Sequence, residues 1–156
     1  MSASPPRPFT PAEERFGSIV IRVMTTLNVL LYRVTGGWLG GRFLRGAPVM
    51  LLTTTGRRSG EPRTVALLYL RDGDDLIVVG SKGGMSHHPL WFRNLETNPR
   101  CEVQLGRERR AMVARQASSG EKAALWPRLV AMYPDFASYQ ARTPRDIPVI
   151  VLSPQR

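Results

Sequence analysis

The stretch that decides the fold spans residues 48–70 and has the sequence PVMLLTTTGRRSGEPRTVALLYL. Two runs rich in β-branched and aliphatic residues, Pro48–Thr55 and Thr64–Leu70, flank a turn from Gly56 to Pro62. Such runs favour strands, and glycine and proline between them favour a turn. We therefore expect an antiparallel hairpin with a polar, arginine-rich tip.

The same strand-like composition recurs later in the chain. The later runs are Leu76–Gly80, Cys101–Leu105, Ala111–Ala117 and Ile147–Leu152. The pair Asp72-Gly73 is typical of a tight hairpin turn. Helical segments at Pro89–Asn98 and Ser119–Tyr133 interrupt the strands before the fourth and the last run. This order predicts an α+β fold in which helices cover an antiparallel barrel.

An amphipathic helix is expected before the strands, over residues 13–35. Its apolar residues follow one face of a 3.6-residue period: Phe16, Val20, Val23, Leu27, Leu30, Leu31 and Val34. The charge-free run Val23–Tyr32 is much shorter than the roughly 20 residues of a membrane span, so we expect no span. Either the helix packs on its own domain, or it lies in a membrane interface with its apolar face down and Arg15, Arg22 and Arg33 toward acidic lipids.

Composition limits the classes of protein to consider. The 156 residues are 42% hydrophobic and 22% charged, which is typical of one globular domain. The single cysteine, Cys101, cannot form an internal disulfide, which favours the cytosol. Residues 1–12 are proline-rich, lack the features of a secretory signal and are expected to form a flexible tail. The net charge of +10 attracts nucleic acid, anionic membranes or anionic ligands alike.

The tip of the first hairpin is a candidate anion site. Three threonines, 53–55, lead into Gly56, and Arg57, Arg58 and Arg63 follow. Glycine lets backbone N–H groups converge on an anion, and arginine supplies a planar fork of donors. The Gly-Lys-Ser/Thr ending of a Walker loop is missing. A solvated hairpin tip would have the same composition, so both interpretations stay open.

A second glycine-rich turn, residues 80–84, follows the third strand. Ser81 could donate a hydrogen bond to a ligand there and Lys82 could hold an anionic oxygen, or the loop is simply solvated. His87 and His88 have no cysteine or carboxylate cluster around them, so no metal is expected. Cys101 lacks a catalytic signature and is expected to pack.

Aromatic residues gather near the C-terminus. Trp126, Tyr133, Phe136 and Tyr139 fall on a short helical stretch. Such a stripe is usually part of a core. It could also form the wall of an apolar pocket, where tyrosine hydroxyls orient a substrate or donate a proton.

Four motifs, taken in order, resemble the deazaflavin-dependent nitroreductase family. The motifs are LLTTTGRRSGxPR, GSKGG, PLWFxNLxxNP and WPxLVxMYP, and the match runs from about Gly46 to the C-terminus. The resemblance implies a split β-barrel over residues 46–156, preceded by a helix and linker at residues 13–45. It also implies coenzyme F420 in its reduced form as hydride donor, with quinones and in some members nitroaromatic compounds as acceptors.

The resemblance further implies which residues form the site. Those implied to contact the coenzyme are Thr55, Gly56, Arg57, Arg58, Ser59, Arg63, Ser81, Lys82, Pro89, Trp91 and Asn94. Those implied to serve the reduction are Tyr133, Tyr139 and Ser81. Members that reduce bulky nitroimidazoles tend to carry tyrosine where this chain has Phe136, so quinones are the better expected acceptors.

Two rival functions follow from the same residues. A split barrel can instead bind flavin mononucleotide or handle heme, because a fold does not determine function. A basic nucleic-acid-binding module is the other rival. It is disfavoured because the arginines gather in one turn and aromatic RNA-binding signatures are missing, so no nucleic-acid partner is expected. The expected location is the cytoplasm, with peripheral attachment to the membrane through residues 13–35 as an option.

Overall fold

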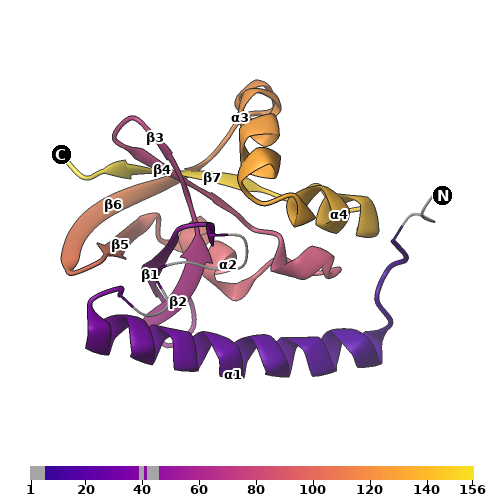
Figure 1. Ribbon diagram of the computed structural model, residues 1–156, viewed down its shortest axis with the longest axis horizontal. Coiled ribbons are helices and arrows are strands. Elements are labelled where there is room, and N and C mark those ends of the chain that lie inside the picture. The colour runs from indigo at the N-terminus through magenta and orange to yellow at the C-terminus, as the bar shows by residue number, and fades with distance from the viewer. Residues whose placement is uncertain (1–5, 39–40, 42–45) are drawn as a thin grey trace.

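The computed structural model describes residues 6–38, 41 and 46–156 and has an α+β fold (Figure 1). The strands are β1 (Val49–Thr55), β2 (Pro62–Leu68), β3 (Leu70–Asp72), β4 (Asp75–Val79), β5 (Arg100–Leu105), β6 (Glu108–Gln116) and β7 (Val149–Pro154). The helices are α1 (Pro11–Thr35), α2 (Leu90–Thr97), α3 (Ser119–Met132) and α4 (Asp135–Arg142), with a 3-10 turn η2 (Lys82–Gly84).

All seven strands join one curled antiparallel sheet in the order β2-β1-β5-β6-β7-β4-β3. This half-barrel confirms the predicted split β-barrel. The sequence predicted one strand over Thr64–Leu70, and this was wrong. The run divides at Tyr69, because β2 pairs with β1 while β3 pairs with β4 at the opposite edge of the sheet. The chain therefore passes directly from one edge of the sheet to the other.

The first hairpin forms as the sequence predicts. Thr55 pairs with Pro62, and the turn closes through hydrogen bonds from Gly56 N to Glu61 O and from Gly60 N to Gly56 O, both 2.8 Å. Gly60 has φ +72°, a left-handed conformation that glycine adopts without strain. The arginines are thus presented on a tight, internally bonded turn.

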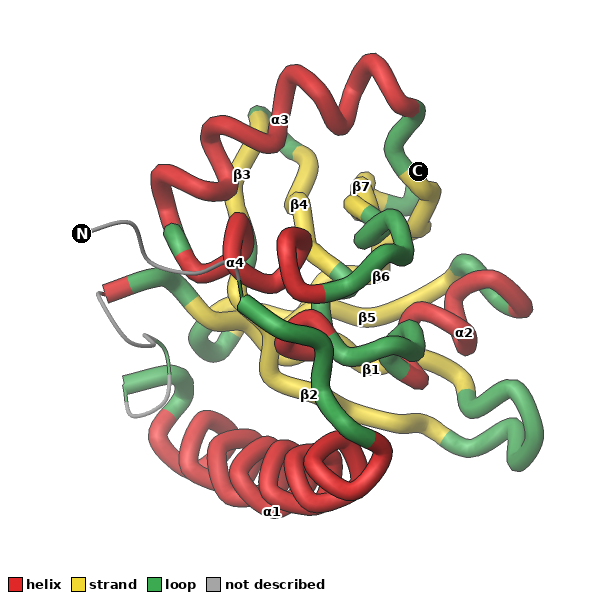
Figure 2. Tube along the Cα trace, turned by 90° about the vertical axis from the view of Figure 1, so that its right-hand side faces the viewer, coloured by secondary structure: helices red, strands yellow, loops and turns green. Residues whose placement is uncertain are grey.

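Alternating side chains of the strands build two layers of core. Toward the barrel interior they pack with Trp91, Phe92 and Leu95 of α2. Toward the outside, β4 and β7 pack against α3 and α4. Figure 2 shows α3 and α4 on one side of the barrel and α1 on the other. Helix α2 therefore plugs the barrel, and its first turn lies beside the candidate site.

Helix α1 begins at Pro11, two residues before the predicted start at residue 13. Thr10 caps it: its hydroxyl accepts from Glu13 N and the Glu13 carboxylate accepts from Thr10 N. The helix ends at Gly36, which is left-handed at φ +63°. Of the predicted flexible tail at residues 1–12, residues 1–5 lie outside the described part of the chain.

The apolar face of α1 points away from the domain. The seven residues that define the period are all exposed, from Val20 at 38% to Val34 at 73%. Val29 and Tyr32, on the opposite face, are buried instead against Leu51 of β1. Helix α1 therefore packs on its own domain, but through Val29 and Tyr32 and not through the predicted apolar face, which stays exposed. By length and composition alone, α1 is also long and apolar enough to cross a membrane. Core helices of soluble proteins and signal sequences meet the same criterion.

Candidate functional site

The arginine turn carries two cations that the protein does not neutralise. Arg57 and Arg58 are exposed, and their guanidinium groups make no hydrogen bond or ion pair to any described residue. Arg63 lies 3.4 Å from the Ser59 hydroxyl and 4.0 Å from the Glu61 carboxylate. Exposed, unpaired guanidinium groups on a glycine-bounded turn suit an anionic ligand.

Asn94 ties this turn to α2. The Asn94 side chain is only 6% exposed. Its amide N–H donates to Thr54 Oγ1 at 3.0 Å, and its Oδ1 accepts from Arg57 N at 3.2 Å. Both contacts lie within the protein, so Asn94 holds the turn in place. The resemblance had implied a coenzyme contact for this residue.

The glycine-rich turn after β4 has an unusual backbone. Lys82, Gly83 and Gly84 have φ values of +45°, +63° and +79°. Among the described residues, Lys82 is the one non-glycine residue with a positive φ. This left-handed conformation is costly for a residue with a side chain. A methyl group at Gly84 would lie 2.7 Å from Tyr139 O, so only glycine fits against α4.

Ser81 and Lys82 both stay available to a ligand. Ser81 is 9% exposed, and neither its hydroxyl nor the Lys82 ammonium makes a hydrogen bond or ion pair within the described chain. That Ser81 and Lys82 contact the coenzyme stays a prediction drawn from the resemblance.

Pro89 and Trp91 begin α2. Pro89 is buried at the N-cap position, and Trp91, 7% exposed, packs in the barrel core with Phe92 at 6.4 Å between ring centroids. The main role visible for Trp91 is therefore packing.

The spacing of the aromatic residues suggested one helical stretch, but the structure divides it between two helices. Helix α3 ends at Met132, and α4 starts at Asp135 after Pro134, which cannot continue the helical hydrogen bonding. The bend still brings the rings together. Their centroids are 5.1 Å apart for Tyr133 and Phe136 and 6.2 Å apart for Tyr133 and Tyr139.

The two tyrosine hydroxyls of this cluster share a hydrogen bond of 3.2 Å. Burial, together with the bond to Tyr139, raises the pKa of Tyr133 well above its usual value. Tyr133 is 5% exposed and Tyr139 is half-buried, so Tyr139 is the more accessible side chain of the pair.

Sequence reasoning missed two residues that shape the site. Arg145 donates to the backbone carbonyls of Gly80, Ser81 and Met85, and Glu14 accepts from Ser86. Neither belongs to a motif, and each is brought close only by the fold.

Metal binding finds no support in the described ranges, where no group of three or more His, Cys, Asp and Glu could hold an ion. His88 Nδ1 lies 3.0 Å from Arg145 Nη1 and accepts its hydrogen bond. Burial raises the pKa of Cys101 to about 12, which makes this thiol inert and agrees with packing.

The fold is that of the split-barrel, flavin-reductase-like proteins, and its exposed cationic turn suits an anionic coenzyme. Residues 24–154 match the model of the F420H(2)-dependent quinone reductase family. The chain belongs to this family, which confirms the resemblance, and its coenzyme is reduced F420. The unpaired arginines fit the anionic tail of that coenzyme.

Relatives cover nearly the whole barrel. The Mycobacterium tuberculosis protein Rv3178 is 45% identical over 75% of this chain and 98% of its own length. The F420H(2)-dependent quinone reductase Rv1261c of that species is 39% identical over 81% of this chain and 87% of its own length. A solved F420-H2 dependent reductase, FDR-A, has a TM-score of 0.63 with 37% identity and covers 68% of this chain and 94% of its own. Another solved structure, described as a domain-swapped dimer, has a TM-score of 0.66 with 34% identity and covers 87% of this chain and 98% of its own.

Proposed function

We propose that this chain transfers a hydride from reduced coenzyme F420 to a quinone, and that its two tip arginines hold the coenzyme. The observation that carries this assignment is the pair Arg57 and Arg58, which are exposed and whose guanidinium groups have no partner among the described residues, on a turn that Asn94 fixes to α2. When bound, the 5-deazaflavin supplies a hydride in a two-electron step.

The protein's own residues bind and orient. Arg57, Arg58 and Arg63, with the Thr55, Gly56 and Ser59 part of the turn, bind the phosphate and the acidic tail. Ser81, Lys82 and the first turn of α2 meet the ring. Correct placement of ring and acceptor is the main contribution that a protein makes to hydride transfer.

Reduction of a quinone to a quinol also takes up a proton. Tyr139 is the half-exposed member of the hydroxyl pair and is proposed to donate to the quinone oxygen. Tyr139 is then proposed to recover its proton from solvent, while the Tyr133 hydroxyl, 3.2 Å away, orients it. Nitroaromatic compounds are proposed as weaker acceptors.

The direct test is oxidation of the reduced coenzyme by the purified protein with a panel of quinones and nitroaromatic compounds. Titration with flavin mononucleotide and with heme serves as the comparison. Tight coenzyme binding and quinone turnover support the assignment. Binding of flavin mononucleotide alone would instead favour the rival split-barrel function.

We also propose that α1 attaches the protein to the cytoplasmic face of a membrane, where quinones dissolve. Its outward apolar face and the basic residues Arg15 and Arg22 support this attachment, whereas Arg33 donates to Thr64 of the barrel at 3.0 Å. Vesicle flotation with acidic lipids tests it, using Leu27→Lys and Leu31→Lys, both at exposed positions. The double variant should stay in solution and keep coenzyme binding; equal flotation of variant and parent would refute the attachment.

A further inference from the structure

Arg145, in the loop between α4 and β7, donates only to neutral acceptors. Its Nε donates to Met85 O at 2.8 Å, its Nη2 to Ser81 O at 2.6 Å, and its Nη1 to Gly80 O at 3.2 Å. A fourth acceptor is His88 Nδ1, at 3.0 Å. Every one of these acceptors lies in the segment 80–88, three of them backbone carbonyls and one a ring nitrogen, so all the hydrogen bonds that the guanidinium donates among the described residues go to this one segment.

Charge does not explain this arrangement. Arg145 is half-buried and has no ion pair among the residues described. Burial lowers its pKa, with a smaller opposing influence from Glu14. A buried cation is costly unless it is well hydrogen-bonded, so the contacts to the carbonyls offset the burial. A lysine could satisfy only part of this planar set.

The same segment is held from its other side by a carboxylate. Glu14 of α1 accepts from Ser86 N and from Ser86 Oγ, each at 2.7 Å. Arg145 thus takes the carbonyls and Glu14 takes an N–H. Between these two contacts lie Lys82, Gly83 and Gly84 with their positive φ values. Such a backbone persists only where its surroundings over-determine it.

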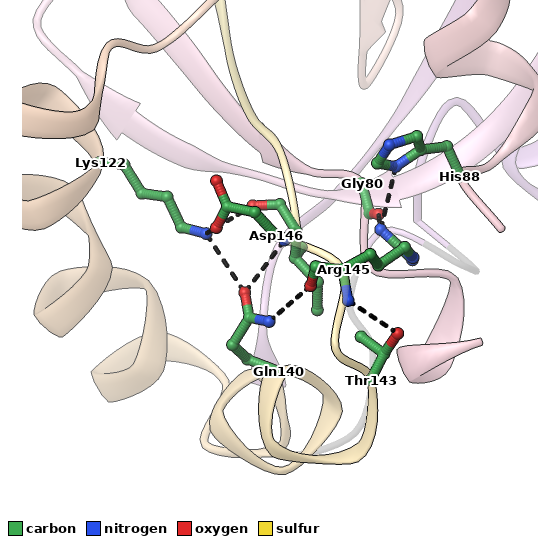
Figure 3. A network of polar contacts seen from close by, with 8 residues as sticks. Gly80, His88, Lys122, Gln140, Thr143, Arg145 and Asp146 are labelled. Atoms are coloured by element: carbon green, nitrogen blue, oxygen red, sulfur yellow. Dashed lines mark hydrogen bonds and ion pairs between the residues drawn. The ribbon is translucent and has the colours of Figure 1, made fainter. Parts of the chain in front are cut away.

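Arg145 is itself fixed from behind (Figure 3). Gln140 Nε2 donates to Arg145 O at 2.8 Å. Gln140 Oε1 accepts from Lys122 Nζ at 3.2 Å and from Ile147 N at 3.0 Å, and Lys122 also donates to Asp146 at 2.6 Å. The network therefore links α3 and α4 to the loop that carries Arg145.

From these contacts we infer that Arg145 is a positioning residue, which holds Ser81 and Lys82 in the conformation that the coenzyme ring requires. The inference rests on the proposed function of these two residues. It assigns Arg145 no contact with coenzyme or quinone. Its effect on the reaction passes through the backbone of residues 80–88.

Three variants test the inference: Arg145→Gln, Arg145→Lys and, as the control, Arg128→Gln. Arg128 donates to Asp72 and to the Arg71 carbonyl, on the β3–β4 hairpin. The first measurement is hydrogen–deuterium exchange of the coenzyme-free protein. In Arg145→Gln, amides of residues 80–88 should exchange about tenfold faster while those of β1 and β5 stay protected. Arg145→Lys should fall between this variant and the parent, and Arg128→Gln should match the parent.

The second measurement separates binding from reaction. Because the tip arginines are intact, Arg145→Gln should change the coenzyme Kd by less than about threefold, whereas kcat for quinone should fall at least about tenfold. Parent-like exchange and kcat in Arg145→Gln would overturn the inference. So would an equal rise in exchange across the whole sheet, which marks a general loss of stability.

Two outcomes are covered by a second variant or by the coenzyme-free measurement. If Arg145→Gln does not fold, Glu14→Ala, which removes the opposite contact, should show the faster exchange of residues 80–88, and its absence overturns the inference. If the parent does not bind the coenzyme, the proposed function fails. The exchange experiment still decides whether Arg145 holds the segment, because it uses no coenzyme.

Discussion

The side-chain amide of Asn94 donates to the buried hydroxyl of Thr54 at 3.0 Å, which fastens the plug helix α2 to the end of β1. We expect Thr54→Val and Asn94→Leu each to lower the free energy of unfolding by about 1–3 kcal/mol, because each leaves a buried polar group without its partner. The double variant should cost less than the sum, and chemical denaturation measures this coupling. Strictly additive losses would show that the bond contributes nothing.

The tip arginines should contribute to binding more than to reaction. Arg57→Ala or Arg58→Ala is expected to weaken coenzyme binding by about 1–3 kcal/mol, the usual loss for a charge-assisted hydrogen bond to an anion. Calorimetric titration measures the change. Arg71→Ala, at an exposed position on β3, is the control. Dissociation constants unchanged in both tip variants would reduce the turn to an ordinary hairpin.

The tyrosine pair should affect turnover and leave affinity intact. Tyr139→Phe removes the proposed donor and Tyr133→Phe removes its 3.2 Å neighbour, so both should slow quinone reduction while coenzyme Kd stays near the parent value. Stopped-flow oxidation of the reduced coenzyme measures the rate, with Tyr69→Phe as control. Parent-like rates in both would leave these residues as packing.

Phe136 should influence the choice of acceptor. It is 5% exposed and packs against both Tyr133 and Tyr139. Phe136→Tyr adds a hydroxyl to this cluster, and a hydroxyl that pairs with a substrate oxygen is worth about 1–3 kcal/mol. We expect nitroimidazole turnover to rise relative to quinone turnover. A constant ratio of the two rates in the same assay would contradict this expectation.

Helix α1 contacts the segment that carries Ser81 and Lys82. All four motifs follow Gly46, so the motifs alone would predict that removal of residues 1–35 leaves the coenzyme site intact. The structure predicts otherwise, because truncation removes the Glu14 contact to Ser86 and uncovers Leu51. The truncated protein should melt at a lower temperature and bind coenzyme more weakly than Leu27→Lys, which changes only the outward face. Equal melting and binding would contradict this.

His88 should make stability depend on pH. Burial, and to a lesser extent Arg145, lowers its pKa, so the folded state favours the neutral ring that accepts from Arg145. The unfolded state takes up the proton first, so stability is complete above about pH 6.5 and falls as the pH drops below that value. Melting of the parent between pH 7.5 and 5.5 should shift more than melting of His88→Gln. Identical shifts would exclude His88 as the cause.

Much of this protein was predictable from local sequence. Strand and turn composition placed the β1–β2 hairpin and the Asp72-Gly73 turn, because those preferences act between near neighbours in the chain. The family was equally accessible, since the four motifs occur as continuous stretches. The arginine turn could be named as a candidate anion site, but composition could not separate a cradle from a solvated tip.

Tertiary structure decided what depends on distant partners. One apolar run divides into β2 and β3 because Leu68 pairs with β1 and Leu70 pairs with β4. This places β2 and β3 at opposite edges of the sheet. The outward face of α1 arises because Val29 and Tyr32, not the periodic apolar residues, meet Leu51. Periodicity states that a helix has an apolar face, but not which surface covers it.

The clearest case is Arg145, which lies in no motif and whose neighbours in sequence carry no sign of a site. It acts on Gly80, Ser81 and Met85, about 60 positions earlier, and those contacts exist only after the barrel brings the α4–β7 loop beside the end of β4. The sequence by itself determined the chemistry of the site, because arginine, lysine, serine and glycine carry their donors and backbone freedom wherever they stand. The fold decided which of those groups hydrogen-bond within the protein and which remain available to a ligand. Hydrogen bonding requires positions in space that no local sequence pattern encodes.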